Sequence, residues 1–286
     1  MIGFIGSVFS PWYRWSGRRA PEDNCCINVA TYGPGGRFTM TDRGAAALRR
    51  SRRELHIGPS RMAWADGRLV IDIDEWAAPP LPGRVRGRVV VTPSALSGFA
   101  ADLDSRGRHV WRPFAPVARI DVDLNRGWRW QGHGYLDGNF GTAALEADFR
   151  RWTWGRYPTG EGTAVFYDAT RRDGGRLDLA MRFAPDGTAC QVLAPPPARF
   201  GRTLWGLRRQ TRADPGFRPR QIRSLLDAPF YARALVETRL EGELTQGVHE
   251  VLDLDRFASP LLMPMLALRV PRRRAWRHAG AVPGPA

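Results

Sequence analysis

The sequence predicts an all-β protein made of two antiparallel barrel or sandwich halves with few short helices. Three observations lead to this fold class. Apolar and polar residues alternate with a period of two in many short segments, as in Leu69–Asp74, where Leu69, Ile71 and Ile73 share one face. Turn-forming residues such as Gly33-Pro34-Gly35-Gly36 separate these segments. Helical periodicity is scarce, and the pattern is typical of sheets closed into barrels or packed as sandwiches.

Further alternating segments run from end to end of the chain, at residues 85–91, 120–124, 162–170, 176–183 and 235–244. The apolar N-terminus breaks at Pro11 and lacks a positively charged start, so we expect a first strand and not a signal peptide. The best helix candidate is Thr41–Leu55, with Thr41 as its N-cap.

The length of 286 residues allows two ordinary domains. The alternation is interrupted near residues 145–156 and restarts at Thr163. We therefore expect an N-terminal β domain over residues 1–150 and a C-terminal β domain with a basic tail over residues 151–286. The segment 195–219 reads as one long loop, and a loop of that length is often functional or a lid.

The balance of charge is strongly basic, at +15, and all 43 basic residues are arginine. Such a protein is attracted to polyanions, either nucleic acid or an anionic membrane surface. No nucleic-acid-binding motif is present, so a membrane surface is the preferred partner. The apolar segment 257–270 precedes an arginine cluster at 271–277, which suits shallow insertion into an anionic interface. The alternative is a final strand that packs on the second domain.

Three cysteines, Cys25, Cys26 and Cys190, form no CxxC or zinc-ligand spacing, which is a reduced, intracellular pattern. No apolar run reaches the ~18 residues that a membrane span needs. We expect a cytoplasmic protein that associates peripherally with the membrane, with oligomeric state unknown. The pairs Asp72/Asp74 and Asp121/Asp123 are better explained as the solvent face of a sheet than as metal ligands, and no metal site is predicted.

Two triplets carry the chemistry, His109-Val110-Trp111 and Tyr135-Leu136-Asp137. Residues two apart in a strand share a face, so each triplet places two functional side chains together. An acid, an imidazole and two aromatic rings could converge on an apolar substrate that needs a proton. The odd positions of Trp128–Asn139 line either a cavity or the solvent face. Nucleotide-binding, zinc-peptidase and common serine-hydrolase motifs are absent from the sequence.

Several unusual blocks occur in order along nearly the whole chain. They are GFIGSVFSPWYRWSGR, NVATYGP, RHVWRPFAP, GYLDGN, FYDATRRDG and LDLDRFASPLLMPMLALRVPRR. Together they resemble the carotenoid 1,2-hydratases, also called hydroxyneurosporene synthases. The resemblance implies two lipocalin-like halves and a hydro-lyase that adds water to the terminal 1,2 double bond of acyclic carotenoids such as neurosporene and lycopene. It also implies that no redox cofactor takes part.

The essential HxW and YxD residues of that family correspond here to His109, Trp111, Tyr135 and Asp137. We expect Asp137 to protonate C2, the two aromatic rings to flank the cation at C1, and His109 either to activate water or to hold the Asp137 proton. Further candidates for the substrate site are His133, Trp130, Trp152, Trp154 and Tyr167. Three alternatives remain open: a non-catalytic isoprenoid carrier, a cofactor-free polyene cyclase and, least favoured, a nucleic-acid binder.

Overall fold

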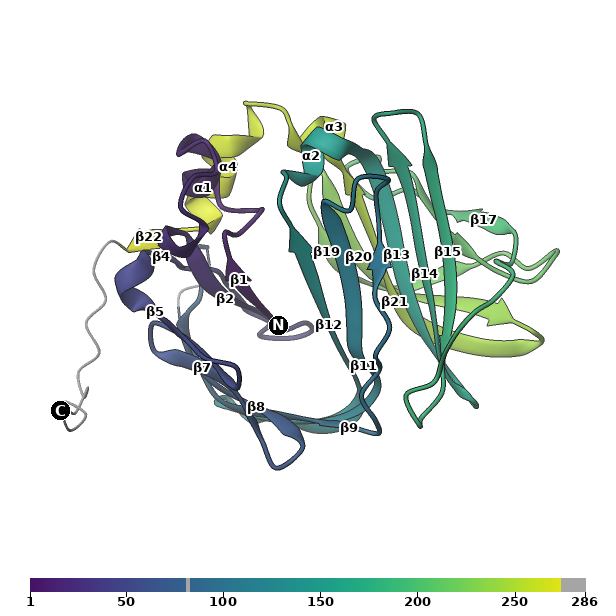
Figure 1. Cartoon of the computed structure of the whole chain (residues 1–286), viewed down its shortest axis with the longest axis horizontal. Helices are drawn as coiled ribbons and strands as arrows, with labels where there is room; N and C mark the ends of the chain where they lie inside the picture. Colours follow the sequence, from purple (N-terminus) through teal and green to yellow (C-terminus); the bar gives the residue numbers. More distant parts are fainter. Residues whose placement is uncertain (81–82, 274–286) are drawn as a thin grey trace. The chain divides into compact units, whose positions relative to one another are not determined.

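Antiparallel β-sheets make up most of the computed structural model, which describes residues 1–80 and 83–273 (Figure 1). The helices are few and short, so the predicted all-β class is confirmed. Within the described residues no sheet closes on itself, which favours the sandwich form of the prediction over the barrel form. The likeness to lipocalins stays a prediction.

The chain forms two compact units. The first contains Met1–Thr92, Ile120–Gly132 and Pro260–Ala286, and the second contains Pro93–Arg119 and His133–Ser259. These two units differ from the predicted domains, which divide the chain at residue 150. The division at residue 150 stays a prediction. All four residues of the HxW and YxD triplets belong to the second unit.

A small sheet of the first unit joins the two ends of the described chain. Its strand order is β1-β2-β4-β22, with β3 paired to β2. The bounds are β1 (Ile2–Ile5), β2 (Cys25–Ala30), β3 (Phe38–Thr39), β4 (Asp42–Arg43) and β22 (Arg272–Arg273). The expected first strand is therefore confirmed as β1. The unit also holds α1 (Pro11–Trp15), η1 (Pro21–Asp23), η2 (Ala45–Ala47) and α4 (Leu262–Arg269).

A larger sheet of eight strands has the order β10-β11-β9-β8-β7-β6-β5, with β12 paired to β11. The strands are β5 (Leu48–Arg50), β6 (Glu54–Ile57), β7 (Ser60–Ala65), β8 (Arg68–Trp76), β9 (Arg84–Pro93), β10 (Ala101–Asp102), β11 (His109–Leu124) and β12 (Trp128–Gly141). The long strands β11 and β12 contribute residues to both compact units.

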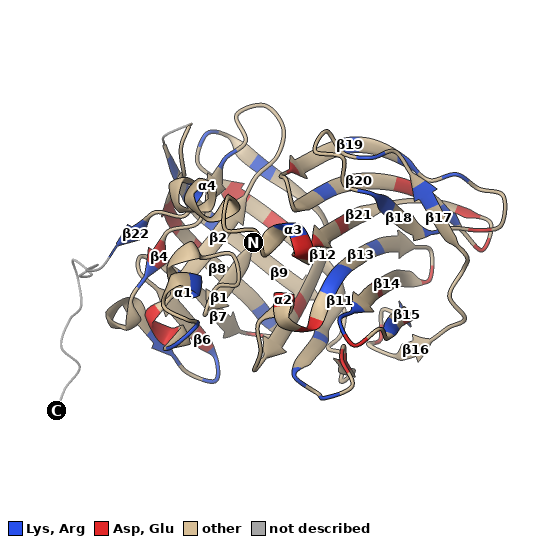
Figure 2. Ribbon diagram, turned by 90° about the horizontal axis from the view of Figure 1, so that it is seen from above, with Lys and Arg blue, Asp and Glu red and all other residues tan. Residues whose placement is uncertain are grey.

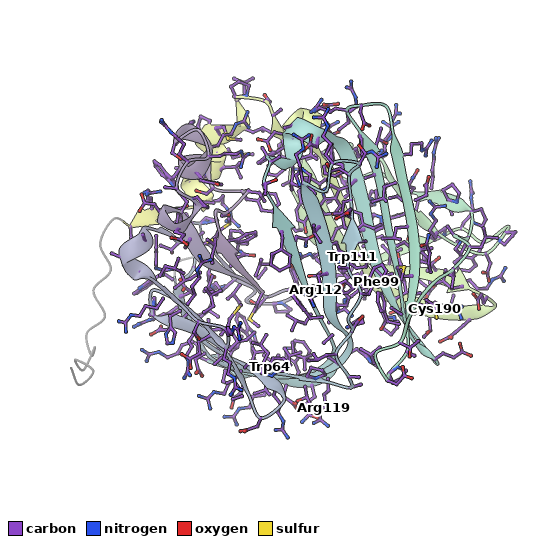
Figure 3. All side chains as sticks on the ribbon, in the orientation of Figure 1. Trp64, Phe99, Trp111, Arg112, Arg119 and Cys190 are labelled. Atoms are coloured by element: carbon purple, nitrogen blue, oxygen red, sulfur yellow. The ribbon has the colours of Figure 1, made fainter. Side chains whose placement is uncertain are left out.

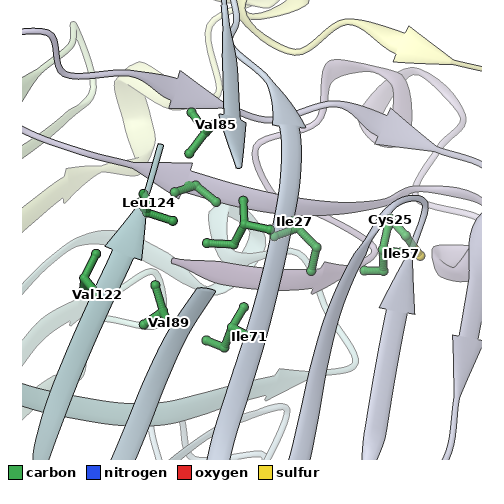
Figure 4. Close-up of a cluster of buried hydrophobic side chains, with 10 residues drawn as sticks. Cys25, Ile27, Ile57, Ile71, Val85, Val89, Val122 and Leu124 are labelled. Atoms are coloured by element: carbon green, nitrogen blue, oxygen red, sulfur yellow. The ribbon is translucent and has the colours of Figure 1, made fainter. Parts of the chain in front are cut away.

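The core of the first unit follows the alternation seen in the sequence. Ile71 and Ile73 of β8 are buried in a cluster with Ile27, Val89 and Val122 (Figure 4). The aspartates between them point the other way and pair with arginines of the neighbouring strand β9: Asp72 with Arg88, and Asp74 with Arg84 and Arg86. Their interpretation as a solvent-facing row is confirmed.

The two adjacent cysteines of β2 also point to opposite faces of their strand. Cys25 packs in the cluster that contains Ile71, whereas Cys26 packs in a separate cluster with Met40 and Val270. Burial raises the pKa of the Cys25 thiol to about 11, so it remains protonated at neutral pH.

The helix expected over Thr41–Leu55 is wrong. This segment contains β4, one 3₁₀ turn at Ala45–Ala47, β5 and the start of β6. Buried polar contacts with distant residues hold it: Ser10 Oγ donates to Asp42 Oδ2 at 2.5 Å, and Arg272 Nη1 donates to Asp42 Oδ1 at 2.9 Å. Burial raises the pKa of Asp42 to about 6 in spite of these donors.

The segment 257–270, for which we considered a membrane-inserting tail or a final strand, is helical except for a turn at 258–261 and Val270. It runs from the end of α3 (Leu254–Phe257) through α4, which lies beside α1 (Figure 1). Trp12 Nε1 donates to Val270 O at 2.6 Å, and this bond holds the end of α4. Of the expected arginine cluster, residues 274–277 lie outside the described residues.

A seven-stranded antiparallel sheet dominates the second unit, in the order β16-β15-β14-β13-β21-β20-β19. Its strands are β13 (Phe149–Thr159), β14 (Gly162–Arg171), β15 (Arg176–Phe183), β16 (Ala189–Gln191), β19 (Arg220–Asp227), β20 (Tyr231–Leu240) and β21 (Glu243–Asp253). The short helix α2 (Leu145–Asp148) leads directly into β13.

The expected long loop at 195–219 is partly strand. It contains the antiparallel pair β17 (Pro197–Phe200) and β18 (Arg209–Arg212). Buried groups of β18 bind the seven-stranded sheet: Thr211 Oγ1 lies 2.8 Å from the Tyr157 hydroxyl, and Arg212 pairs with Asp168 and Asp178. The segment is therefore not one continuous loop, and β18 packs on the sheet; a role as a lid stays a prediction.

Arginines are spread over strands and loops throughout the chain (Figure 2). Many of them lie against carboxylates, as in the buried pair Arg43–Glu75 at 2.7 Å and the pair Arg233–Glu250 at 2.7 Å. Part of the positive charge is therefore neutralised locally, and no single helix carries the excess among the described residues.

Candidate active site

Two strands position the residues of the HxW and YxD triplets. In the first half of β11 the odd-numbered residues 109–115 are buried, so His109 and Trp111 point into the second unit while Arg112 is exposed. On β12, Tyr135 and Asp137 are half-buried. The expectation that residues two apart share a face places each pair correctly, and the structure shows which of the four meet.

The Asp137 carboxyl group is the meeting point of three of them. The Trp111 indole Nε1–H donates to Asp137 Oδ2 at 2.9 Å, and the Tyr135 hydroxyl donates to the same oxygen at 3.2 Å. Among the described residues, no hydrogen bond to Oδ1 accompanies them. The carboxyl group is thus held through one oxygen, and the other is left for a proton or a ligand.

Aromatic rings surround this group. Trp111 is fully buried and makes edge-to-face contacts with Phe99, Tyr167 and Phe183, at centroid distances of 6.1, 5.9 and 6.3 Å. Trp111 and Phe99 appear next to each other in Figure 3. These contacts fix the indole ring and therefore the direction of its N–H group.

Strand β13 supplies two more rings. Trp154 makes an edge-to-face contact with Tyr135 at 5.3 Å, and Trp152 lies 5.7 Å from Tyr167. Trp154 is directly opposite Tyr167 in the β13–β14 register, and directly opposed residues point to the same face of a sheet. Three expected substrate-site residues, Trp152, Trp154 and Tyr167, therefore lie in the aromatic group around Asp137.

The electrostatics of the site favour a protonated acid. Burial raises the pKa of Asp137 above its ordinary value, and the negative charge of Glu250 adds to the rise. The hydrogen bonds from Trp111 and Tyr135 and the positive charge of Arg156 act in the opposite direction. The Arg156 guanidinium group lies over the Tyr135 ring, 5.3 Å from its centroid. Burial wins, so the carboxyl group keeps its proton to a higher pH than an exposed aspartate does.

His109 does not join the Asp137 carboxyl group. Its Nε2 atom lies 2.7 Å from Asp148 Oδ2, and its ring packs on Phe149 at 5.0 Å. Its backbone N–H donates to Asp104 Oδ1 at 2.9 Å. One ring nitrogen is therefore already committed to a carboxylate at the end of α2.

The remaining two candidates are exposed. His133 and Trp130 both lie at the surface on β12, and Trp130 belongs to the first compact unit. Sequence reasoning missed Phe99, Arg156 and Glu250, which all act on the Asp137 group or on a ring that touches it. Phe99 comes from the loop before β10, and Arg156 and Glu250 come from β13 and β21 of the other sheet, so no local sequence pattern brings them to Asp137.

Among the described residues, no three His, Cys, Asp or Glu side chains come close enough to hold a metal ion. In the same part of the chain, the helices are too short or too polar to cross a membrane.

The family model described as "Carotenoid hydratase CrtC" matches residues 1–279 of this chain. The chain belongs to the carotenoid hydratase family. The resemblance seen in the sequence is therefore confirmed, and the expectation of a hydro-lyase agrees with it.

Three relatives of this family member carry the name acyclic carotenoid 1,2-hydratase. The protein from Cereibacter sphaeroides is 64% identical over 96% of this chain and 99% of its own length. The protein from Rhodobacter capsulatus is 56% identical over 97% of this chain and 99% of its own length. The protein from Thiocapsa roseopersicina is 47% identical over 95% of this chain and 68% of its own length.

Among solved structures, the family member is similar to the crystal structure of a protein described as AttH from Nitrosomonas europaea. The TM-score is 0.59 at 14% sequence identity, and the match covers 80% of each chain. At this identity the likeness concerns the fold alone.

Proposed function

We propose that this protein hydrates the terminal 1,2 double bond of acyclic carotenoids such as neurosporene and lycopene, giving 1-hydroxy carotenoids. Family membership and the names of the relatives support the activity. The observation that carries the mechanism is the Asp137 carboxyl group, held through Oδ2 alone inside an aromatic group. Hydration of an alkene begins with transfer of a proton to the double bond, and the raised pKa of Asp137 favours the protonated acid that this step needs.

The proton is carried by Asp137 Oδ1, since Oδ2 already accepts two hydrogen bonds. The π electrons of the double bond take that proton and form a C–H bond at C2, which leaves a tertiary cation at C1. A water molecule then forms the C–O bond at C1 and releases a proton. One water is added and no electron is transferred, so the reaction as written needs no redox cofactor.

The aromatic rings stabilise the cation at C1. The faces of tryptophan and tyrosine attract a positive charge by about 0.5–2 kcal/mol each, and more strongly when water is excluded. Around the carboxyl group the Trp111 ring contacts Tyr167 and the Tyr135 ring contacts Trp154, and Trp154 is opposite Tyr167 in the strand register. The positive charge of Arg156 repels the cation. We therefore assign Arg156 the role of stabilising the Asp137 carboxylate that forms when the proton leaves.

His109 is assigned a positioning role. Its Nε2 contact with Asp148 and its backbone bond to Asp104 fix the start of β11, two residues before Trp111. This supports neither of the two direct roles that we expected from sequence, in which His109 activates water or holds the Asp137 proton. In this role His109 acts on Trp111 through the strand that carries both residues.

The substrate dissolves only in a membrane, so the protein must bind a membrane surface to reach it. Leu261, Met265 and Leu268 follow one face of α4 and are 86, 37 and 72% exposed. The opposite side of the helix is held by α1, where Arg14 Nη1 lies 3.6 Å from Met263 Sδ. An exposed apolar stripe on a protein of charge +15 suits an anionic, cytoplasmic-side lipid interface.

The experiment is an incubation of purified protein with lycopene, followed by mass spectrometry for the gain of one water. Asp137→Asn removes the acidic proton and keeps the shape, so we expect hydration to fall at least 100-fold, in the range typical of a lost general acid of about 10²–10⁴-fold. Asp123→Asn is the control, because Asp123 is an exposed partner of Arg129.

Near-normal turnover by the Asp137→Asn variant would contradict the acid role. Recovery of unchanged lycopene with the wild-type protein would favour a carrier, and an isomeric ring product would favour a cyclase. Retention of the protein on DNA or RNA with no effect on lycopene would favour the nucleic-acid alternative.

A further inference from the structure

Two buried donors of the site have no acceptor among residues 1–80 and 83–273. The indole N–H groups of Trp152 and Trp154 are enclosed by protein, and neither finds a hydrogen-bond partner within the described part of the chain. Trp154 is only 9% exposed. A buried donor without an acceptor costs about 1–3 kcal/mol, and native proteins rarely accept that cost unless a ligand or water completes the bond.

The proposed reaction restricts what the acceptor can be; this step rests on the proposed function. The substrate is a hydrocarbon and has no atom that accepts a hydrogen bond. Only the attacking water and the hydroxyl group of the product can accept from an indole N–H. An indole N–H group without an acceptor, in the aromatic group around Asp137, is therefore suited to bind the oxygen atom that the reaction adds to the substrate.

A second carboxylate stands beside this donor. Glu250 of β21 is directly opposite Trp154 of β13 in the strand register, so the two side chains share the face that carries Tyr167. Trp154 in turn contacts Tyr135, whose hydroxyl group binds Asp137. Glu250 and Asp137 are thus close enough for the charge of one to act on the other.

Arg233 holds this carboxylate by one oxygen. Arg233 is directly opposite Glu250 on β20, and its Nε and Nη2 atoms lie 2.8 and 2.7 Å from Glu250 Oε1. Both contacts go to Oε1, and within the described residues Oε2 has no hydrogen-bond partner. Oε2 is therefore the oxygen of Glu250 that is placed to accept a hydrogen from a bound molecule, while burial raises the pKa of Asp137 and suits it to give a proton.

We propose that Trp154 and Glu250 hold the attacking water, with the indole N–H of Trp154 donating to the water oxygen and Glu250 Oε2 accepting its hydrogen. As a lone pair of the water forms the C–O bond at C1, the water proton passes to Glu250. The Asp137 proton has meanwhile formed the C–H bond at C2. Glu250 then releases its proton to solvent and Asp137 takes one up, which restores the starting state with one water consumed.

The test uses lycopene in deuterated water with Glu250→Gln and Trp154→Phe. Asp137 still delivers deuterium in both variants, but capture of the cation is impaired. We expect hydrated product to fall about 10²-fold or more in Glu250→Gln, as for a lost general base, and about 10-fold in Trp154→Phe. The recovered hydrocarbon should contain carbon-bound deuterium, because a cation that is not captured loses a proton and returns to an alkene.

Matched controls separate this role from a structural one. Glu237→Gln removes another cross-strand Arg–Glu pair of the same sheet, that of Arg220 with Glu237, and should hydrate lycopene like the wild type. Trp76→Phe changes an exposed tryptophan in the first unit. Trp154→Phe leaves the Arg233–Glu250 pair intact, so it tests the water site even if the Glu250 variant folds poorly.

Three results would overturn the inference. They are hydration by Glu250→Gln within about threefold of the wild type, unimpaired hydration by Trp154→Phe, and loss of deuterium incorporation together with hydration in folded Glu250→Gln. Failure of the proposed function gives a different result, since the wild-type protein itself would then yield neither hydrated product nor deuterated hydrocarbon.

Discussion

Removing the Tyr135 hydroxyl group tests how the fold sets the acidity of Asp137. Tyr135→Phe deletes the 3.2 Å hydrogen bond to Asp137 Oδ2 and keeps the ring that packs on Trp154 and under Arg156. Burial and the neighbouring Asp137 raise the pKa of Tyr135 well above its usual value, so the hydroxyl group is a neutral donor over the working pH range. A donor to Oδ2 stabilises the carboxylate, so its loss must raise the pKa of Asp137.

The size of the change follows from the geometry. A hydrogen bond to a charged group contributes about 1.5–3 kcal/mol, and a length of 3.2 Å is at the long end for an O–H donor. We therefore take about 1.5 kcal/mol, which corresponds to about one pKa unit at 1.36 kcal/mol per unit. The active acid is the protonated form, so the hydration rate falls as pH rises through this pKa. The alkaline limb of the variant should lie about one pH unit higher.

The assay is the initial rate of lycopene hydration from pH 5 to 10 for the wild type and the variant. Tyr157→Phe is the matched control, because Tyr157 is buried on β13 and its hydroxyl group binds Thr211 instead. Its alkaline limb should not move. If Tyr135→Phe turns over too slowly, the pKa of Asp137 can be read from the pH dependence of thermal unfolding, by comparison with a variant that also carries Asp137→Asn. An unchanged or lower pKa would refute the reasoning.

Two further predictions concern stability and membrane binding. Because burial raises the pKa of Asp137, the folded state binds its proton more tightly than the unfolded chain, and the contribution of Asp137 to the stability falls as pH rises above about 4. The melting temperature of Asp137→Asn should therefore rise relative to that of the wild type between pH 4 and pH 8. A constant difference between the two melting temperatures across this range would contradict a raised pKa of Asp137. In vesicle sedimentation, glutamate at both Leu261 and Leu268 should weaken binding to anionic lipid at least 10-fold, since each buried leucine contributes about 1.5–3 kcal/mol, and high salt should release the wild type. Leu193→Glu changes a leucine that is 96% exposed in the second unit, and an equal loss there would argue against α4 as the contact.

The sequence predicted the strands better than the segments between them. The alternation in Leu69–Asp74 specified correctly which side chains of β8 are buried, because a strand with one buried face has a period of two. Thr41–Leu55 was wrong because its conformation depends on distant partners. Asp42 and Arg43 are buried against Ser10, Arg272 and Glu75, and no local pattern contains that information.

The candidate site was predicted in part for the same reason. Period-two reasoning paired Tyr135 with Asp137, and their hydrogen bond bears this out geometrically. It could not show that Trp111 would reach the same carboxyl group while His109 turned to Asp148. Glu250 escaped notice entirely, since its relation to Trp154 exists only through the pairing of β13 with β21.

The pairing of β22 with β4 has a consequence for biosynthesis. The buried Asp42 pairs with Arg272, which follows it by 230 positions in the chain. At about 5–20 residues per second, a ribosome needs about 10–50 s to make that stretch. Throughout this time the Asp42 carboxylate has its donor Ser10 but lacks Arg272, and every residue of the second unit is made before Arg272. The second unit can therefore complete its sheet before β22 is made, and the small sheet of the first unit is completed only once β22 has been made.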